Sequence, residues 1–144
     1  MPREDRKRDD AGYRLDMIRA SDMIRGYLRS TNATFAKFVS TTIQNQLLRD
    51  GIERNLGKIG EAAYEFSEAG RRQYPTIPWN EISGMRQYLI HGYWAVDPDK
   101  SWEAATKYAP ELARTLRARE LKKPSLQLEA EIERVISQRK KKKK

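Results

Sequence analysis

Apolar residues recur at helical spacing along most of the chain. In residues 11–29 they fall three, four or seven positions apart, which is the pattern of an amphipathic helix. The members of this first face are Met17, Ile18, Ile24, Tyr27 and Leu28. No segment shows the alternation of apolar and polar residues that marks a half-buried strand. The pattern therefore predicts an all-α fold, an up-down bundle of four to five helices.

A longer apolar face predicts a second helix from Ser40 or Thr41, either of which can cap it, to about Gln73. Its members are Leu48, Ile52, Leu56, Ile59, Ala63 and Phe66. Glycine weakens a helix by about 1 kcal/mol relative to alanine, so Gly57 and Gly60 need a compensating reason. We expect another backbone to approach this helix closely on the side that carries them. Between the first two helices, Phe35 and Phe38 predict a short helical turn that covers an end of the core.

Prolines and caps divide the remainder of the chain. Pro78 suits an early helical position and glycine suits a helix end, which predicts a third helix from Trp79 to His91 with Gly92 as its stop. The Asp97–Pro98 pair starts a fourth helix, which is expected to end by Pro124. Its apolar stripe consists of Trp102, Ala105, Ala109, Leu112 and Leu116, and Pro110 within it predicts a kink or a restart.

The last helix is predicted to start at Ser125 and to be amphipathic, with Leu128, Ile132, Val135 and Ile136 on one face. It leads into the lysine run. We therefore divide the chain into a helical bundle domain, residues 1–123, and a C-terminal amphipathic helix with a disordered polylysine tail, residues 124–144.

Composition narrows the function classes. The 144 residues fit one domain, and they include no cysteine and one histidine, which excludes a disulfide framework, a thiolate metal site and a histidine-rich metal site within one chain. No metal or cofactor is expected. The N-terminal residues 1–10 are too charged for a signal peptide, and no apolar run approaches the roughly 20 residues of a membrane span. We expect a soluble cytoplasmic protein without membrane contact.

The charge points to a polyanionic partner, mainly through the C-terminus. The formal net charge is +9, and the six residues 139–144 carry six of these charges, which leaves +3 for the rest. A lysine run is more often a solvated, disordered end than a specific site. It is also suited to salt-sensitive binding of nucleic acid.

The candidate chemistry lies in the third helix. Arg86 precedes His91 with four residues between them, and Tyr93 follows His91 after one residue. At 100° per residue, Arg86 and His91 lie about 140° apart around a helix axis. They converge only if the helix is distorted near His91 or if two copies of the chain meet along this helix.

These residue types suit transesterification of RNA, in which the ribose 2′-hydroxyl attacks the adjacent phosphate. A histidine can take or give the proton, and an arginine can stabilise charge on the phosphorane. No metal ion is required for this chemistry. Taken alone, however, a single histidine near a helix end is more often a structural hydrogen-bonding group than a catalyst.

The segment resembles the HepT-like branch of the HEPN superfamily, whose signature is Arg, four residues, His, any residue, Tyr. Arg86, His91 and Tyr93 supply it. The resemblance covers about residues 15–116. It continues in Arg54-Asn55-Leu56, Ile59-Gly60-Glu61-Ala62-Ala63, Ile77-Pro78-Trp79, Gly84-Met85, Val96-Asp97, Trp102 and Pro110-Glu111-Leu112.

The resemblance implies a helical HEPN bundle that forms a homodimer around the third helix. It further implies a toxin of a type VII-like toxin–antitoxin system that acts as a metal-independent endoribonuclease on tRNA or mRNA. Arg86 and His91 fall on the catalytic positions. Tyr93 falls on the tyrosine that a cognate MntA-like minimal nucleotidyltransferase antitoxin modifies with AMP, and a higher complex with this antitoxin can form. Added AMP brings bulk and negative charge, which exclude RNA.

One departure keeps alternatives open. Gln87 stands where these nucleases commonly carry a shorter polar residue, often asparagine. We expect Gln87 and Tyr93 to support the positioning of the substrate. The first alternative is a non-catalytic HEPN module that binds RNA or nucleotide beside a nucleotidyltransferase partner. The second is a plain helical interaction domain whose last helix and tail bind nucleic acid.

Overall fold

The computed structural model describes residues 9–91, 97–122 and 126–142. These residues form helices and connecting turns, and no strand occurs among them, so the predicted all-α fold class is confirmed. The helices in chain order are α1 (Asp10–Ser30), α2 (Phe35–Phe38), α3 (Ile43–Glu65), α4 (Glu68–Gln73), α5 (Trp79–His91), α6 (Pro98–Glu103), the π-helix η2 (Ala104–Tyr108), α7 (Ala109–Ala118) and α8 (Leu126–Lys142).

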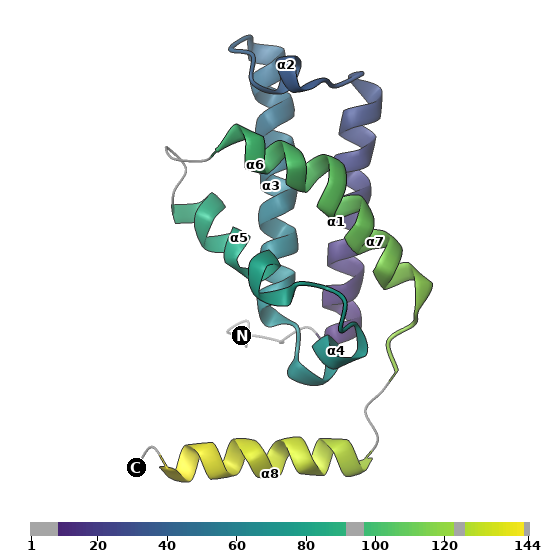
Figure 1. Cartoon of the computed structure of the whole chain (residues 1–144), viewed down its shortest axis with the longest axis vertical. Coiled ribbons are helices and arrows are strands. Elements are labelled where there is room, and N and C mark those ends of the chain that lie inside the picture. The colour runs from purple at the N-terminus through teal and green to yellow at the C-terminus, as the bar shows by residue number, and fades with distance from the viewer. Residues whose placement is uncertain (1–8, 92–96, 123–125, 143–144) are drawn as a thin grey trace, which may run out of the picture.

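Helix α3 is the centre of the bundle. It packs against α1 on one side and against α5 on the other, and α7 lies across α1 (Figure 1). The side chains that are almost fully buried between these helices are Met17, Ile24, Phe38, Ile52, Leu56, Ile59 and Leu116. Burial of each such apolar side chain stabilises the fold by about 1.5–3 kcal/mol. The apolar faces of α1, α3 and α7 thus meet in one core, to which Trp79 and Ile82 of α5 also belong.

The helix starts follow local capping chemistry. Asp97 accepts a hydrogen bond from the Asp99 backbone N–H at 2.9 Å, and Pro98 occupies the first turn of α6, as predicted. Helix α3, in contrast, is capped by Thr42 rather than by Ser40 or Thr41. The Thr42 hydroxyl accepts from the backbone N–H three residues further on, at 3.3 Å, which is the usual geometry of an N-cap.

The predicted long second helix is wrong at its C-terminal end. Helix α3 ends at Glu65, and α4 begins after Ser67, whose hydroxyl accepts from the Gly70 backbone N–H at 3.0 Å. The Asp10 carboxylate accepts from the Ser67 backbone N–H at 2.9 Å. Because this carboxylate comes from the first turn of α1, 57 residues earlier in the sequence, the break depends on a tertiary contact as well as on a local cap.

Pro110 lies in the first turn of α7, which begins at Ala109 after a π-helix, so the predicted restart of the helix is confirmed. The five residues before α7 form the π-helix η2, in which the Ala109 backbone N–H donates to the Ala104 carbonyl five residues earlier. A proline lacks a backbone N–H, so a local widening of the helix is a way to accommodate it. The helix then ends at Ala118, before the predicted limit at Pro124.

The short turn α2 is present, and its two phenylalanines differ in burial. Phe38 is fully buried, whereas Phe35 is 40% exposed. Both rings contact the Trp102 ring, at centroid distances of 5.4 Å and 6.1 Å. Phe38 therefore covers the end of the core as expected, and Phe35 forms the outer edge of the same aromatic group.

Helix α8 lies below the bundle in Figure 1. It extends through Lys142, so the structure places helix where the sequence predicted the start of a disordered lysine tail. Val135 and Ile136 are 43% and 48% exposed. The division of the chain at residue 123 stays a prediction. None of the helices that the structure describes combines the length and apolar character needed to span a bilayer.

Candidate active site

Helix α5 carries the candidate residues, and buried aromatic side chains anchor its first turn. The Trp79 indole N–H donates to the carbonyl oxygens of Tyr74 and Arg71 at 3.1 Å and 3.2 Å. The Trp79 ring stacks on the Phe66 ring at a centroid distance of 5.0 Å. Trp79 therefore ties the start of α5 to the preceding turn and to the end of α3, which positions the residues further along α5.

Close backbone packing brings the middle of α5 onto α3. A Cβ atom added at Gly60 would lie 2.8 Å from the Arg86 backbone nitrogen and 3.2 Å from the Ile82 carbonyl oxygen. The predicted close approach is therefore confirmed at Gly60. It is wrong at Gly57, because an added Cβ there meets nothing within 4 Å. Only a glycine at position 60 lets the backbone of Arg86 come this near.

The Arg86 side chain is held by one turn of α3. Its Nε atom forms an ion pair with the Glu61 carboxylate at 2.6 Å, and its Cζ atom lies 4.4 Å from the centre of the Tyr64 ring. A guanidinium group over an aromatic face gains about 0.5–1 kcal/mol at exposed sites. The ion pair with Glu61 uses only the Nε atom of Arg86. The two terminal nitrogens of the guanidinium group make no hydrogen bond to another described residue. Because the Arg86 side chain is 31% exposed, these nitrogens are available to an anion.

The structure describes the remaining candidate residues to different extents. Gln87 is exposed on α5. His91 is the last residue of α5, so the backbone stays helical from Arg86 to His91 and keeps the two about 140° apart around the axis. The predicted stop at Gly92 and the candidate Tyr93 lie outside the described residues. Within α5, no distortion brings Arg86 and His91 together.

A hollow of about 380 Å³ lies beside the Arg86–Glu61 pair on the same side of α3. Arg54 and Lys58 contribute exposed positive charges to its wall, and Leu89 closes it from α5. Glu53 also lines it, and partial burial raises the pKa of this carboxyl group, an effect that Asp50 adds to and Arg49 opposes. The α3–α5 face therefore combines an oriented arginine with neighbouring cations.

Two residues of this site were missed by the motif analysis. Tyr64 lies three positions after Glu61 and four positions after Gly60 on α3, so Glu61 and Tyr64 are neighbours on the helix surface beside the contact with α5. The Gly60-Glu61 sequence was visible as part of the family pattern, but the pattern alone did not indicate that Glu61 pairs with Arg86. That pairing is a property of the α3–α5 packing.

If Glu61 acts by orienting Arg86, the two residues must be energetically coupled. We expect Glu61→Ala to lower the RNA cleavage that the resemblance implies by about 10-fold in the native chain and to have no further effect in an Arg86→Ala chain, because a double-mutant cycle isolates the pairwise contribution. Glu61→Gln, which keeps an acceptor for Nε, should retain more activity. Glu65→Ala on the same helix is the matched control. Additive losses in the double variant would show that Glu61 acts independently of Arg86.

Among the residues that the structure describes, no group of three or more His, Cys, Asp or Glu side chains is placed to hold a metal ion. The polar groups at the candidate site are an arginine, a carboxylate engaged with it, and a tyrosine ring. This set suits binding and charge stabilisation of a phosphate group.

Comparison with known proteins identifies related sequences. The family model described as "Ribonuclease HepT-like" matches residues 17–119. A Methanocaldococcus jannaschii protein named "Putative RNase" is 33% identical over 106 residues, which cover 74% of this chain and 83% of the relative. A Thermococcus cleftensis protein named "Probable ribonuclease HepT" is 30% identical over 106 residues, covering 74% of this chain and 91% of the relative. No solved structure matches. The family match includes every candidate site residue and ends before α8.

Proposed function

The chain belongs to the HepT-like ribonuclease family, and on that premise we propose that it is a metal-independent endoribonuclease. The observation that carries the proposal is the Arg86 guanidinium, which Glu61 holds by Nε so that the two terminal nitrogens remain for a phosphate. Arginine presents its donors in a planar fork that matches two phosphate oxygens. This geometry is suited to charge that develops on a phosphorane.

In the proposed reaction, His91 accepts the proton of a ribose 2′-hydroxyl, and the 2′-oxygen forms a bond to the adjacent phosphorus. The bond from phosphorus to the 5′-oxygen breaks, that oxygen takes up a proton from water, and His91 then returns the proton that it accepted to the solvent. The products are a 2′,3′-cyclic phosphate and a 5′-hydroxyl end. Arg86 stabilises the additional negative charge on the phosphoryl oxygens, and Gln87 and Tyr93 position the substrate.

The proposed working unit is a homodimer around α5. Within one α5 helix, Arg86 and His91 do not share a face. When two copies face each other across a two-fold axis, the residues of both copies line one cleft. The Arg54 and Lys58 side chains of α3 then lie along the approach to that cleft and attract the RNA backbone.

The cleavage assay tests this function directly. Purified protein is expected to cut cellular RNA, tRNA or mRNA, in the presence of EDTA, and the new ends are expected to be cyclic phosphates. Expression of the chain without a partner is expected to arrest growth. Activity that requires an added divalent cation contradicts the proposed mechanism. RNA binding without cleavage supports the non-catalytic alternative.

We further propose that the chain is the toxin of a toxin–antitoxin pair and that AMP transfer to Tyr93 neutralises it. Co-expression with a cognate minimal nucleotidyltransferase should add AMP-sized mass increments that map to Tyr93, because added bulk and negative charge close the cleft to RNA. Tyr93→Phe should remove the increments, and this variant should resist neutralisation if it remains toxic. Neutralisation without any change in mass points instead to inhibition by complex formation.

A further inference from the structure

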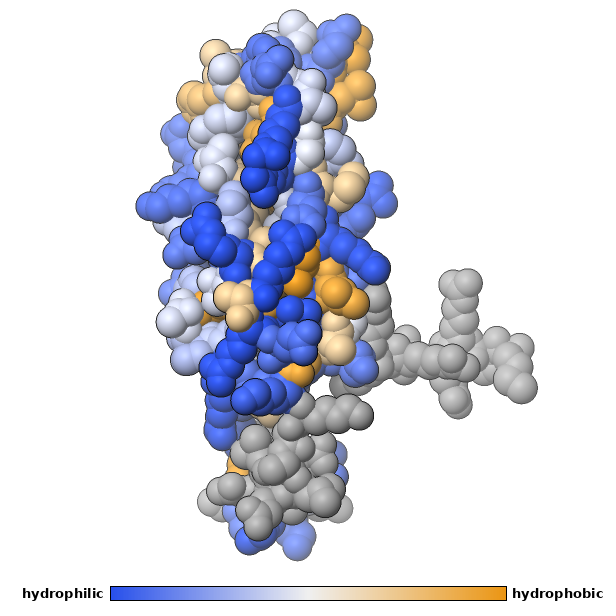
Figure 2. Space-filling model, turned by 90° about the vertical axis from the view of Figure 1, so that its right-hand side faces the viewer, coloured by the Kyte–Doolittle hydropathy of each residue, from blue (hydrophilic) through white to orange (hydrophobic). Residues whose placement is uncertain are grey.

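A groove of about 610 Å³ runs between α1 and α7. Helix α7 packs on α1, whereas α5 packs on α3, so the groove and the Arg86 site belong to different parts of the bundle. Strongly hydrophilic side chains run along the side of the molecule that faces the viewer in Figure 2. The groove volume falls within the range of about 300–1,000 Å³ that is typical of ligand sites.

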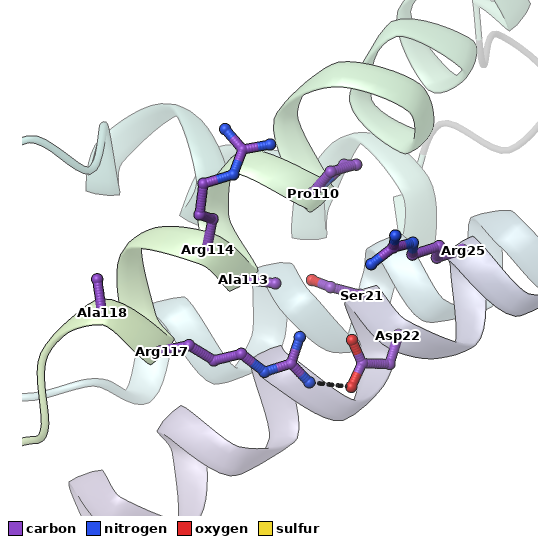
Figure 3. Close-up of a pocket in the computed structure, with 8 residues that line it drawn as sticks. All are labelled: Ser21, Asp22, Arg25, Pro110, Ala113, Arg114, Arg117 and Ala118. Carbon is purple, nitrogen blue, oxygen red and sulfur yellow. Dashed lines mark hydrogen bonds and ion pairs between the residues drawn. The ribbon is translucent and has the colours of Figure 1, made fainter.

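Small side chains form the floor of the groove, and basic side chains form its rim. Ser21 and Ala113 are buried at 3% and 5% exposure, and their short side chains leave the space open. Three arginines line the rim: Arg25 projects from α1, and Arg114 and Arg117 project from α7 (Figure 3). The only acidic residue among the lining residues is Asp22, so the described lining carries a net positive charge.

The three arginines are not equally available. Arg117 forms an ion pair with Asp22 across the groove (Figure 3). Arg25 and Arg114 are exposed, and neither makes a hydrogen bond or ion pair with another residue in the described ranges. Two uncompensated guanidinium groups that face one hollow attract an anion, and each can form charge-assisted hydrogen bonds to phosphate oxygens.

The walls of the groove are held in place. Arg14 of α1 donates two hydrogen bonds to the Leu116 carbonyl oxygen, at 3.2 Å and 2.8 Å. Leu116 itself is fully buried. Together with the Arg117–Asp22 pair, these contacts fix the spacing of α1 and α7. The groove is therefore already formed before a ligand binds, so binding loses little conformational entropy of the groove.

We propose that this α1–α7 groove is a second anion site that binds the phosphate backbone of RNA outside the active cleft. None of the lining residues is aromatic, and none carries an amide side chain, so contacts of the arginine side chains with phosphate oxygens are the main interaction that the groove offers. Contacts of this kind bind the backbone independently of sequence. The identity of the polyanion rests on the proposed function, whereas the anion site itself does not.

The test measures binding of a fluorescein-labelled single-stranded RNA of 20 nucleotides by anisotropy over a range of salt concentrations. Every chain carries His91→Ala so that the RNA remains intact. Arg25→Ala with Arg114→Ala should weaken binding by about 10-fold and make the salt dependence less steep by about 1.4, at about 0.7 per phosphate contact on a single strand. Arg19→Ala with Arg29→Ala, both exposed on α1 and outside the groove, removes the same number of charges and is the matched control.

The Asp22→Asn variant is expected to change RNA affinity in the opposite direction to the arginine variants. It removes the only negative charge of the lining and releases Arg117, so RNA affinity should increase several-fold. Asp50→Asn on α3 makes the same chemical change away from the groove and should have less effect. If the double arginine variant binds as the control does, or if Asp22→Asn matches Asp50→Asn, the groove is not an RNA site. Displacement of the RNA by AMP at equal nucleotide concentration also contradicts a site for a polymer.

These outcomes are independent of the cleavage assay. Loss of RNA affinity in the groove variants supports the second site even if the native chain cuts no RNA. Cleavage that depends on Arg86 and His91, together with unchanged binding in the groove variants, supports the proposed function and overturns the second site.

Discussion

The Arg86→Ala variant is expected to cleave RNA at least about 100-fold more slowly than the native chain, because removal of one preformed donor to a developing oxyanion costs about 100-fold to 1,000-fold. His91→Ala is expected to lose a similar factor, since proton transfer by a positioned side chain contributes about 100-fold to 10,000-fold. Initial rates on a defined RNA in EDTA measure both effects. Arg19→Ala, which is exposed on α1 and lies outside both the α5 site and the α1–α7 groove, is the control for loss of one positive charge.

Arg86→Lys separates charge from geometry. Lysine keeps the positive charge but lacks the planar fork, so this variant should recover little of the lost rate.

A mixture of Arg86→Ala and His91→Ala chains tests the shared cleft. If residues of two copies form one site, mixed dimers should regain part of the activity that neither variant has alone. Cleavage at the native rate by both single variants would instead identify a contaminating nuclease or a different active site.

The second large effect concerns two glycines one turn apart on α3. Gly60→Ala should destabilise the fold by about 1–3 kcal/mol, because overpacking forces the backbone to shift and the added Cβ would meet the Arg86 backbone nitrogen at 2.8 Å. Gly57→Ala should stabilise the fold by up to about 1 kcal/mol through helix propensity, since an added Cβ meets nothing within 4 Å. The two variants are therefore expected to shift stability in opposite directions.

Thermal unfolding measures this difference. For a chain of this size, each 1 kcal/mol changes the melting temperature by about 2–4 °C. Gly60→Ala should also reduce cleavage, because the shift moves Arg86 away from Glu61 and Tyr64. Equal melting temperatures for the two variants would mean that α3 and α5 do not approach as closely as the structure indicates.

The positions of most helices follow from local sequence. The α5 bounds, Trp79–His91, agree with those predicted from Pro78 and the apolar spacing, and the Asp97–Pro98 start agrees as well. Caps, prolines and apolar periodicity act within a few residues along the chain, so they can be read without knowledge of the fold. The signature positions Arg86, Gln87, His91 and Tyr93 were likewise fixed by sequence order alone.

Contacts between distant residues had to come from the tertiary structure. The break before α4 depends partly on the Asp10 carboxylate, which lies 57 residues from Ser67 in sequence. Pairing of Glu61 with Arg86 requires α3 and α5 to meet at Gly60. The sequence by itself determined which segments are helical and which residues are candidates for catalysis, because those signals are local. Only the packing of α3 against α5 decided which nitrogens of Arg86 remain free. Only the packing of α1 against α7 decided where the basic groove forms.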